Sequence, residues 1–130
     1  MKIMVCYDGS AEANKALKLS IKRAQDADAK VYLIHSMAGG QEVPKRDFLN
    51  AEHDLSRAQR LFDTGKIHCE PKLLVRGLSP GKDLVRFADE KKVDEIVIGI
   101  KKRSKVGKLF FGSTAQHVIL YAACPVVTVR

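Results

Sequence analysis

The triplet Gly112-Ser113-Thr114 contains residue types that bind phosphate well. Glycine lets a backbone approach a ligand closely, and the two hydroxyl groups can donate hydrogen bonds to phosphate oxygens. Apolar residues recur at helical spacing from Ala115 to Ala122, so the triplet is expected to begin a helix. Helix N-termini attract anions through unpaired N–H groups and a partial positive charge. We therefore predict a phosphate site here, with a simple helix cap by Ser113 as the alternative.

The segment before the triplet is strongly basic. Lys101 and Lys102 open a run of basic residues, and glycines stand at positions 99 and 107. Charge-assisted hydrogen bonds are roughly twice as strong as neutral ones, so both lysines are predicted to contact a phosphorylated ligand. The segment is not a Walker phosphate loop, because Gly107-Lys108 is followed by Leu109 and has no glycine five residues earlier. It does not match the GxGxxG dinucleotide pattern either.

Asp8 is a second candidate for ligand binding. It lies in the segment Tyr7-Asp8-Gly9-Ser10, which follows a strand-like run, and Ser36 follows another such run. In open parallel sheets, ligands bind beyond the C-terminal ends of the strands. Asp8 can instead cap the helix that is predicted from Ala11, but its position at a strand end favours the binding role.

Strand-like and helix-like patterns alternate along the chain and would position these residues. Strands are predicted for Lys2–Tyr7, Lys30–Ser36, Lys72–Arg76, Val93–Gly99 and Pro125–Val129, and helices for Ala11–Ala27, Pro44–Thr64, and from Pro80 and from Ser113 onward. This alternation predicts an α/β fold with a single open five-stranded parallel sheet and helices on both faces, Rossmann-like, with strand order 3-2-1-4-5. The predicted buried residues of the helices include Leu49, Leu61 and Ile119.

Length and composition indicate one folded domain over residues 1–130. The hydrophobic fraction of 45% and the charged fraction of 29% are ordinary for a globular protein. Met1 leads directly into a strand-like run, without a secretory leader, and the apolar runs are far shorter than the roughly 20 residues that span a bilayer. We therefore expect a cytoplasmic protein with no membrane partner. The net charge of +8 favours anionic partners.

Five short segments resemble one known family, the universal stress proteins, and the likeness covers essentially the whole chain. They are Val5-x-x-Asp8-Gly9-Ser10, Gly77-x-x-Pro80, Asp94-x-Ile96-Val97-Ile98-Gly99, Gly112-Ser113 and Cys124-Pro125-Val126-Val127. Nucleotide-binding members of the family carry Gly-x-x-Gly, nine residues, and then Gly-Ser or Gly-Thr. Gly99 and Gly112-Ser113 match that spacing, whereas Lys102 replaces the second glycine. A lysine there either opposes a close backbone approach or adds positive charge near the phosphates.

The resemblance implies an adenine-nucleotide site between the ends of the first and fourth strands. It implies that Asp8 approaches the ribose or the adenine and that Ser36 lines the adenine by its backbone. Tyr7 and Ile98 would wall the base, and Gly99, Gly112, Ser113 and Thr114 would meet the ribose and the phosphates. The implied ligand is ATP, with or without Mg²⁺.

The implied function is that of a dimeric, nucleotide-responsive regulatory module in the stress response. The resemblance suggests that the homodimer pairs through the C-terminal strand Val126–Val129. The alternative is a universal stress protein that binds no nucleotide and acts as a protein-interaction module. Few aromatic residues accompany the basic run, so nucleic acid is the least favoured partner.

Neither catalysis nor a resident metal is predicted. The three cysteines, Cys6, Cys69 and Cys124, are widely spaced without a CxxC pair, and we expect them to be reduced. The four histidines lie in different predicted elements, with no nucleophile at an obvious reach. We predict that the protein is not an enzyme, beyond at most slow ATP hydrolysis.

Overall fold

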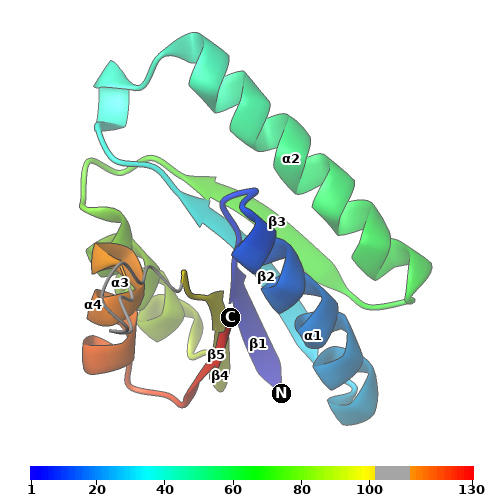
Figure 1. The fold of residues 1–130 in the computed structure, drawn as a ribbon. Helices are drawn as coiled ribbons and strands as arrows, with labels where there is room; N and C mark the ends of the chain where they lie inside the picture. Colours follow the sequence, from blue (N-terminus) through cyan, green and yellow to red (C-terminus); the bar gives the residue numbers. More distant parts are fainter. Residues whose placement is uncertain (102–111) are drawn as a thin grey trace.

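The fold is an open parallel sheet with helices on both faces (Figure 1). The computed structural model describes residues 1–101 and 112–130. Its elements are β1 (Lys2–Cys6), α1 (Ala11–Ala27), β2 (Lys30–Ser36), a 3-10 turn η1 (Gly40–Glu42), α2 (Lys45–Thr64), β3 (Cys69–Leu74), α3 (Pro80–Lys91), β4 (Glu95–Gly99), α4 (Ser113–Tyr121) and β5 (Val126–Val129). The five-stranded sheet has the order β3-β2-β1-β4-β5, and every pairing is parallel. The predicted fold class and strand order are therefore confirmed.

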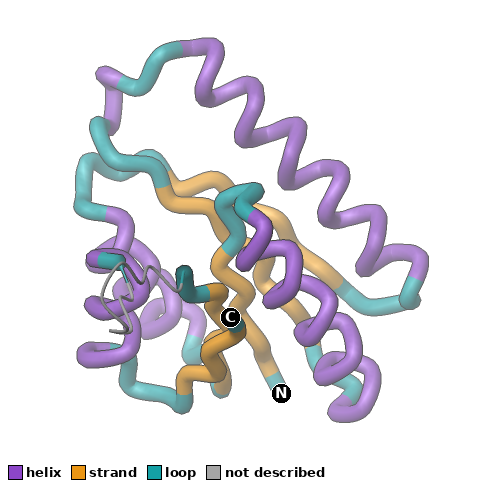
Figure 2. The backbone as a smooth tube through the Cα atoms, viewed as in Figure 1, coloured by secondary structure: helices purple, strands orange, loops and turns teal. Residues whose placement is uncertain are grey.

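The sheet separates two apolar layers, because successive side chains of a strand point to opposite faces. Ile3 and Val5 of β1 pack on the side of α1 and α2, whereas Met4 and Cys6 pack on the side of α3 and α4. Figure 2 shows the strands as the central layer between these helices. Strands that are covered on both faces are apolar at nearly every position, which explains the continuous run Ile96–Ile98 in β4.

The third strand begins and ends earlier in the sequence than predicted, because the predicted range was Lys72–Arg76. It spans Cys69–Leu74 and contains Pro71, which lies opposite Leu33 of β2. Proline has no N–H group and is tolerated in a sheet at the edge, where one side of the strand needs no partner. β3 is an edge strand, so Pro71 does not end it.

Two helices bury fewer apolar residues than the sequence pattern predicts. Leu49 and Leu61 of α2 are exposed, at 52% and 49%, and Ile119 of α4 is 38% exposed. The buried positions are Ala51, Leu55, Ala58 and Phe62 on α2, and Ala115 and Val118 on α4. Each of these helices therefore contacts the rest of the fold along one narrow stripe.

Within the described part of the chain, no helix has the length and apolarity that crossing a membrane requires.

Candidate functional site

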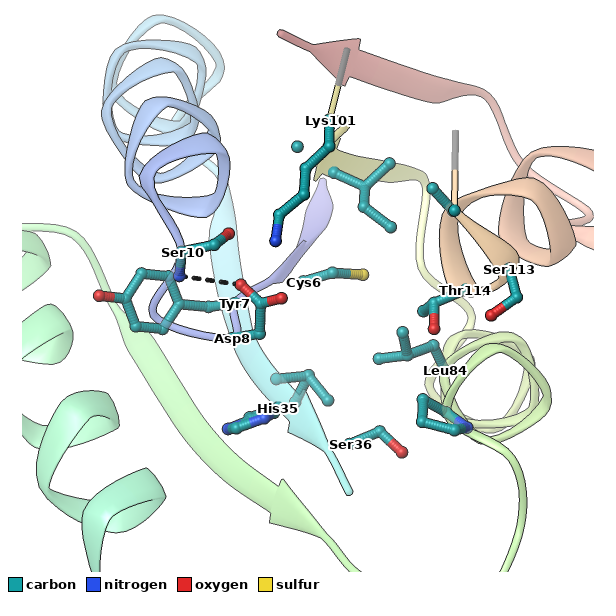
Figure 3. A pocket seen from close by; sticks show the side chains of 16 residues that line it. Cys6, Tyr7, Asp8, Ser10, His35, Ser36, Leu84, Lys101, Ser113 and Thr114 are labelled. Carbon is teal, nitrogen blue, oxygen red and sulfur yellow. Dashed lines mark hydrogen bonds between the residues drawn. The ribbon is translucent and has the colours of Figure 1, made fainter. Parts of the chain in front are cut away.

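A cavity of about 420 Å³ opens at the C-terminal ends of β1, β2 and β4, beside the first turns of α3 and α4 (Figure 3). Pockets for small molecules typically measure roughly 300–1,000 Å³. Nine of the ten predicted site residues border it: Tyr7, Asp8, Ser36, Ile98, Gly99, Lys101, Gly112, Ser113 and Thr114. The tenth, Lys102, lies outside the described residues.

The Asp8 carboxylate shapes the loop between β1 and α1. Its Oδ1 accepts a hydrogen bond of 3.0 Å from the backbone N–H of Ser10. The N-cap of α1 is Ser10, whose Oγ accepts from the N–H of Ala13 at 3.1 Å. Asp8 is therefore not the helix cap. It is an exposed carboxylate at the cavity, as Figure 3 shows.

Tyr7 borders the cavity without turning its ring into it. The ring lies on the far side of Asp8 from the cavity in Figure 3, and its hydroxyl donates to Oδ1 of Asn14 at 3.0 Å. Burial raises the pKa of this hydroxyl above its usual value. The ring itself belongs to the apolar layer beneath α1 and α2. A contact between Tyr7 and a base stays a prediction.

The N-terminus of α4 faces the cavity without a capping side chain. Its N-cap is Gly112, which has no side chain and adopts φ +74°, a conformation that favours glycine. Ser113 and Thr114 are the first two residues of the helix, and both line the cavity (Figure 3). Ser113 is thus not an N-cap residue, which removes the alternative that it simply caps the helix. The arrangement presents N–H groups and hydroxyls to one space.

Gly99 has a packing role that the motif did not indicate. A Cβ atom at this position would lie 2.4 Å from the carbonyl oxygen of Glu12 and 2.9 Å from the backbone nitrogen of Ala13. The end of β4 thus packs directly against the first turn of α1. Glycine is required there by the fold, whatever the cavity binds.

Lys101 is the described basic side chain of the cavity. It is exposed, and in Figure 3 it extends toward Asp8 and Ser10. Together with the N-terminus of α4, this ammonium group makes the cavity attractive to an anion. Among the lining residues that the structure describes, Asp8 is the single carboxylate.

The cavity also has an apolar lining, and sequence reasoning missed most of it. Cys6, Ile34 and Leu84 line the cavity together with Ile98. Burial raises the pKa of the Cys6 thiol to about 12, so this sulfur is not a nucleophile at neutral pH. In the sequence these residues look like ordinary core positions, and only their places near strand ends and on the inner face of α3 could have indicated the cavity.

Ser10, His35, Pro80 and Ala115 also line the cavity and were not predicted as binding residues. Burial lowers the pKa of His35 despite the opposing effects of Asp8 and Asp54, so the imidazole is neutral at pH 7. Three of the four residues lie in strand-end or turn segments, which was the available signal. Within the ranges 1–101 and 112–130, no group of three His, Cys, Asp or Glu residues could hold a metal ion.

Known proteins are similar to this chain in sequence and fold along nearly its whole length. Residues 1–130 match the Universal stress protein family. The universal stress protein in the QAH/OAS sulfhydrylase 3′ region of Thermus aquaticus is 33% identical, over 98% of this chain and 97% of the relative. A solved universal stress protein from Archaeoglobus fulgidus is 40% identical with a TM-score of 0.90, over 100% of this chain and 98% of that chain.

A second similar solved structure contains a nucleotide. It is the universal stress protein from Archaeoglobus fulgidus in complex with dAMP, with 36% identity and a TM-score of 0.86, over 100% of this chain and 98% of that chain. The family match over all residues, together with these relatives, decides the classification. The chain belongs to the universal stress protein family.

Proposed function

We propose that the cavity binds an adenine nucleotide, with the phosphates at the N-terminus of α4. The observation that carries this proposal is the uncapped start of α4, where Gly112, Ser113 and Thr114 line the same cavity as Asp8. Anions bind well at such a helix start. The dAMP complex of the Archaeoglobus fulgidus relative supports the choice of ligand class.

The base would lie against the apolar side of the cavity. Ile34, Leu84 and Ile98 offer apolar contacts for a purine ring, and Ser36 lines the same cavity at the end of β2. Asp8 would accept hydrogen bonds from the ribose, since an ionised carboxylate is an acceptor only. The sugar would then lie near Asp8.

ATP is the proposed ligand, and Lys101 favours it over ligands with fewer charges. The ammonium group of Lys101 extends into the cavity and can pair with phosphate oxygens. Mg²⁺ can accompany ATP through its phosphate oxygens, with Asp8 as the carboxylate available in the described lining. Lys102 is proposed to add a further positive charge to the same phosphates.

We propose a regulatory role rather than an enzymatic one. Efficient hydrolysis of ATP needs a positioned base or metal-binding carboxylates near the phosphates. Of the described lining residues, the one carboxylate, Asp8, belongs to the β1–α1 loop, and His35 lies on β2. Binding would then report nucleotide supply in the cytoplasm, with turnover at most slow.

The proposed homodimer pairs two copies of β5. Both edges of the sheet are open in the described structure, but β3 carries Glu70, Pro71 and Lys72, which discourage pairing. β5 has the sequence Val-Val-Thr-Val and no charge. The carbonyl groups of Pro125, just before β5, and of Val129 accept hydrogen bonds from the N–H groups of Ile96 and Ile100. Backbone bonding alternates along a strand, so Val126 and Thr128 direct their backbone groups away from β4.

Native mass spectrometry of the full chain tests ligand and dimer together. We expect a dimer mass with one adenine nucleotide per chain after addition of ATP.

Thr128→Pro removes an outward N–H group without removing a hydrogen bond between β5 and β4, and it should shift the population to monomer. Thr128→Val should remain dimeric. Binding of no nucleotide would leave the alternative, a protein-interaction module. A wild-type monomer at micromolar concentration would refute the dimer.

A further inference from the structure

A buried carboxylate lies directly behind one wall of the cavity. Asp83, in the first turn of α3, is fully buried, and the next residue, Leu84, lines the cavity. Removing a carboxylate from water is costly unless its charge is paired and its oxygens are hydrogen-bonded. The hydrogen-bond partners of Asp83 therefore indicate its role.

The two oxygens of the Asp83 carboxylate accept hydrogen bonds from two different segments of the chain. Its Oδ1 accepts from Nε of Arg76, in the loop after β3, at 2.5 Å. Its Oδ2 accepts from the hydroxyl of Ser36, at the end of β2, at 3.1 Å. Arg76 also donates to the backbone carbonyl of Asp83 at 3.3 Å and to Glu90 at 3.0 Å, which fixes its guanidinium along α3.

These contacts join the two sides of the apolar part of the cavity. Ser36 lines it from β2, and Pro80 and Leu84 line it from α3. The hydrogen bond between Ser36 and Asp83 spans this junction, while Arg76 pairs with the carboxylate and orients it. The distance between the end of β2 and the start of α3 sets the width of the cavity at this point.

We propose that Asp83 and Arg76 are positioning residues of the nucleotide site, which hold Ser36 and the start of α3 at the separation that the base requires. This inference rests on the proposed nucleotide binding. A second ion pair offers a matched control, because Arg23 binds Glu95 through two hydrogen bonds of 2.6 Å. Glu95 begins β4, at the opposite end of the strand from the cavity residue Gly99.

The test measures the dissociation constant of ATP by calorimetry and the melting temperature without ligand, for the full chain and five variants. Ser36→Ala removes the hydrogen bond to the carboxylate, and Asp83→Asn removes the charge that Arg76 pairs with. Each variant should weaken ATP binding about tenfold. Their combination should weaken binding about tenfold as well, not a hundredfold, because the two residues act as one unit. Ser36→Thr keeps the hydroxyl and should bind within about twofold of the wild type. Glu95→Gln should lower the melting temperature and leave ATP binding unchanged.

Two outcomes would overturn the inference. Wild-type affinity in Ser36→Ala and Asp83→Asn, with ATP binding intact in the parent chain, contradicts the positioning role and leaves the proposed function standing. An equal loss of ATP affinity in Glu95→Gln would show that affinity falls with the stability of the whole fold, not through the Asp83 contacts. If Asp83→Asn does not fold, the comparison of Ser36→Ala with Ser36→Thr decides the question. A parent chain that binds no ATP refutes the proposed function itself.

Discussion

Gly99, at the end of β4, lies so close to α1 that a Cβ atom on it would come within 2.4 Å of the carbonyl oxygen of Glu12. This contact brings the β4 end of the cavity up to the helix that follows Asp8. The glycine that fits the family's nucleotide motif is thus also a packing residue. Stability and ligand binding have to be measured separately at this position.

Gly99→Ala is predicted to destabilise the protein by about 1–3 kcal/mol, the usual cost of an overpacked contact. The carbonyl of Glu12 belongs to the backbone of α1 and cannot swing aside as a side chain would. Chemical denaturation of both proteins without ligand measures the difference. An unchanged free energy of unfolding would mean that β4 and α1 are not in such close contact.

Two serines at helix starts are predicted to behave differently. Ser10 caps α1 through its Oγ, so Ser10→Ala should lower the free energy of unfolding by about 1 kcal/mol. Ser113 follows the N-cap of α4, so Ser113→Ala should keep its stability and bind ATP less tightly. Denaturation and calorimetry on both variants provide the comparison. A loss of stability in Ser113→Ala without any loss of affinity would favour a purely structural hydroxyl.

Asp8→Asn is predicted to weaken ATP binding about tenfold while the fold is unchanged. The asparagine oxygen can still accept the hydrogen bond from the N–H of Ser10, so the loop keeps its shape. What the variant loses is the charged acceptor that we assign to the ribose. Equal affinities of variant and parent, at equal melting temperatures, would remove Asp8 from the binding site.

Acidification is predicted to destabilise the ligand-free protein through His35. Burial lowers the pKa of this imidazole in the folded state, so near and below about pH 6.5 the unfolded chain binds more protons at this residue. The folded state therefore loses stability as the pH falls through the pKa of the unfolded state. The fall in the denaturation midpoint between about pH 7.5 and 5.5 should be smaller in His35→Gln. An identical fall in both proteins would contradict this assignment.

The polar half of the cavity was predictable from the sequence because ligand sites of open parallel sheets lie at strand ends. Asp8 was found by that rule, and Gly112 by the phosphate-binding residue types at a predicted helix start. Most of the apolar lining was not, since Ile34 and Leu84 are indistinguishable in sequence from residues of the closed core. The strand order was predicted correctly, whereas the bounds of β3 were wrong because Pro71 is tolerated at the sheet edge.

The link between Ser36 and Asp83 could not have been predicted. The two residues are 47 positions apart, and Asp83 looks like one more charged residue of an amphipathic helix. Only the folded structure shows that its carboxylate is fully buried and bonded to both Ser36 and Arg76.

Titration calorimetry of the full chain with ATP tests the central claim most directly. The cavity at the ends of β1 and β4 predicts saturable binding with one nucleotide per chain, and a 100-fold excess over the dissociation constant should stabilise the fold by about 2.7 kcal/mol. Ser113→Ala should weaken that binding. The absence of both binding heat and stabilisation at millimolar ATP, in a folded chain, would contradict the account.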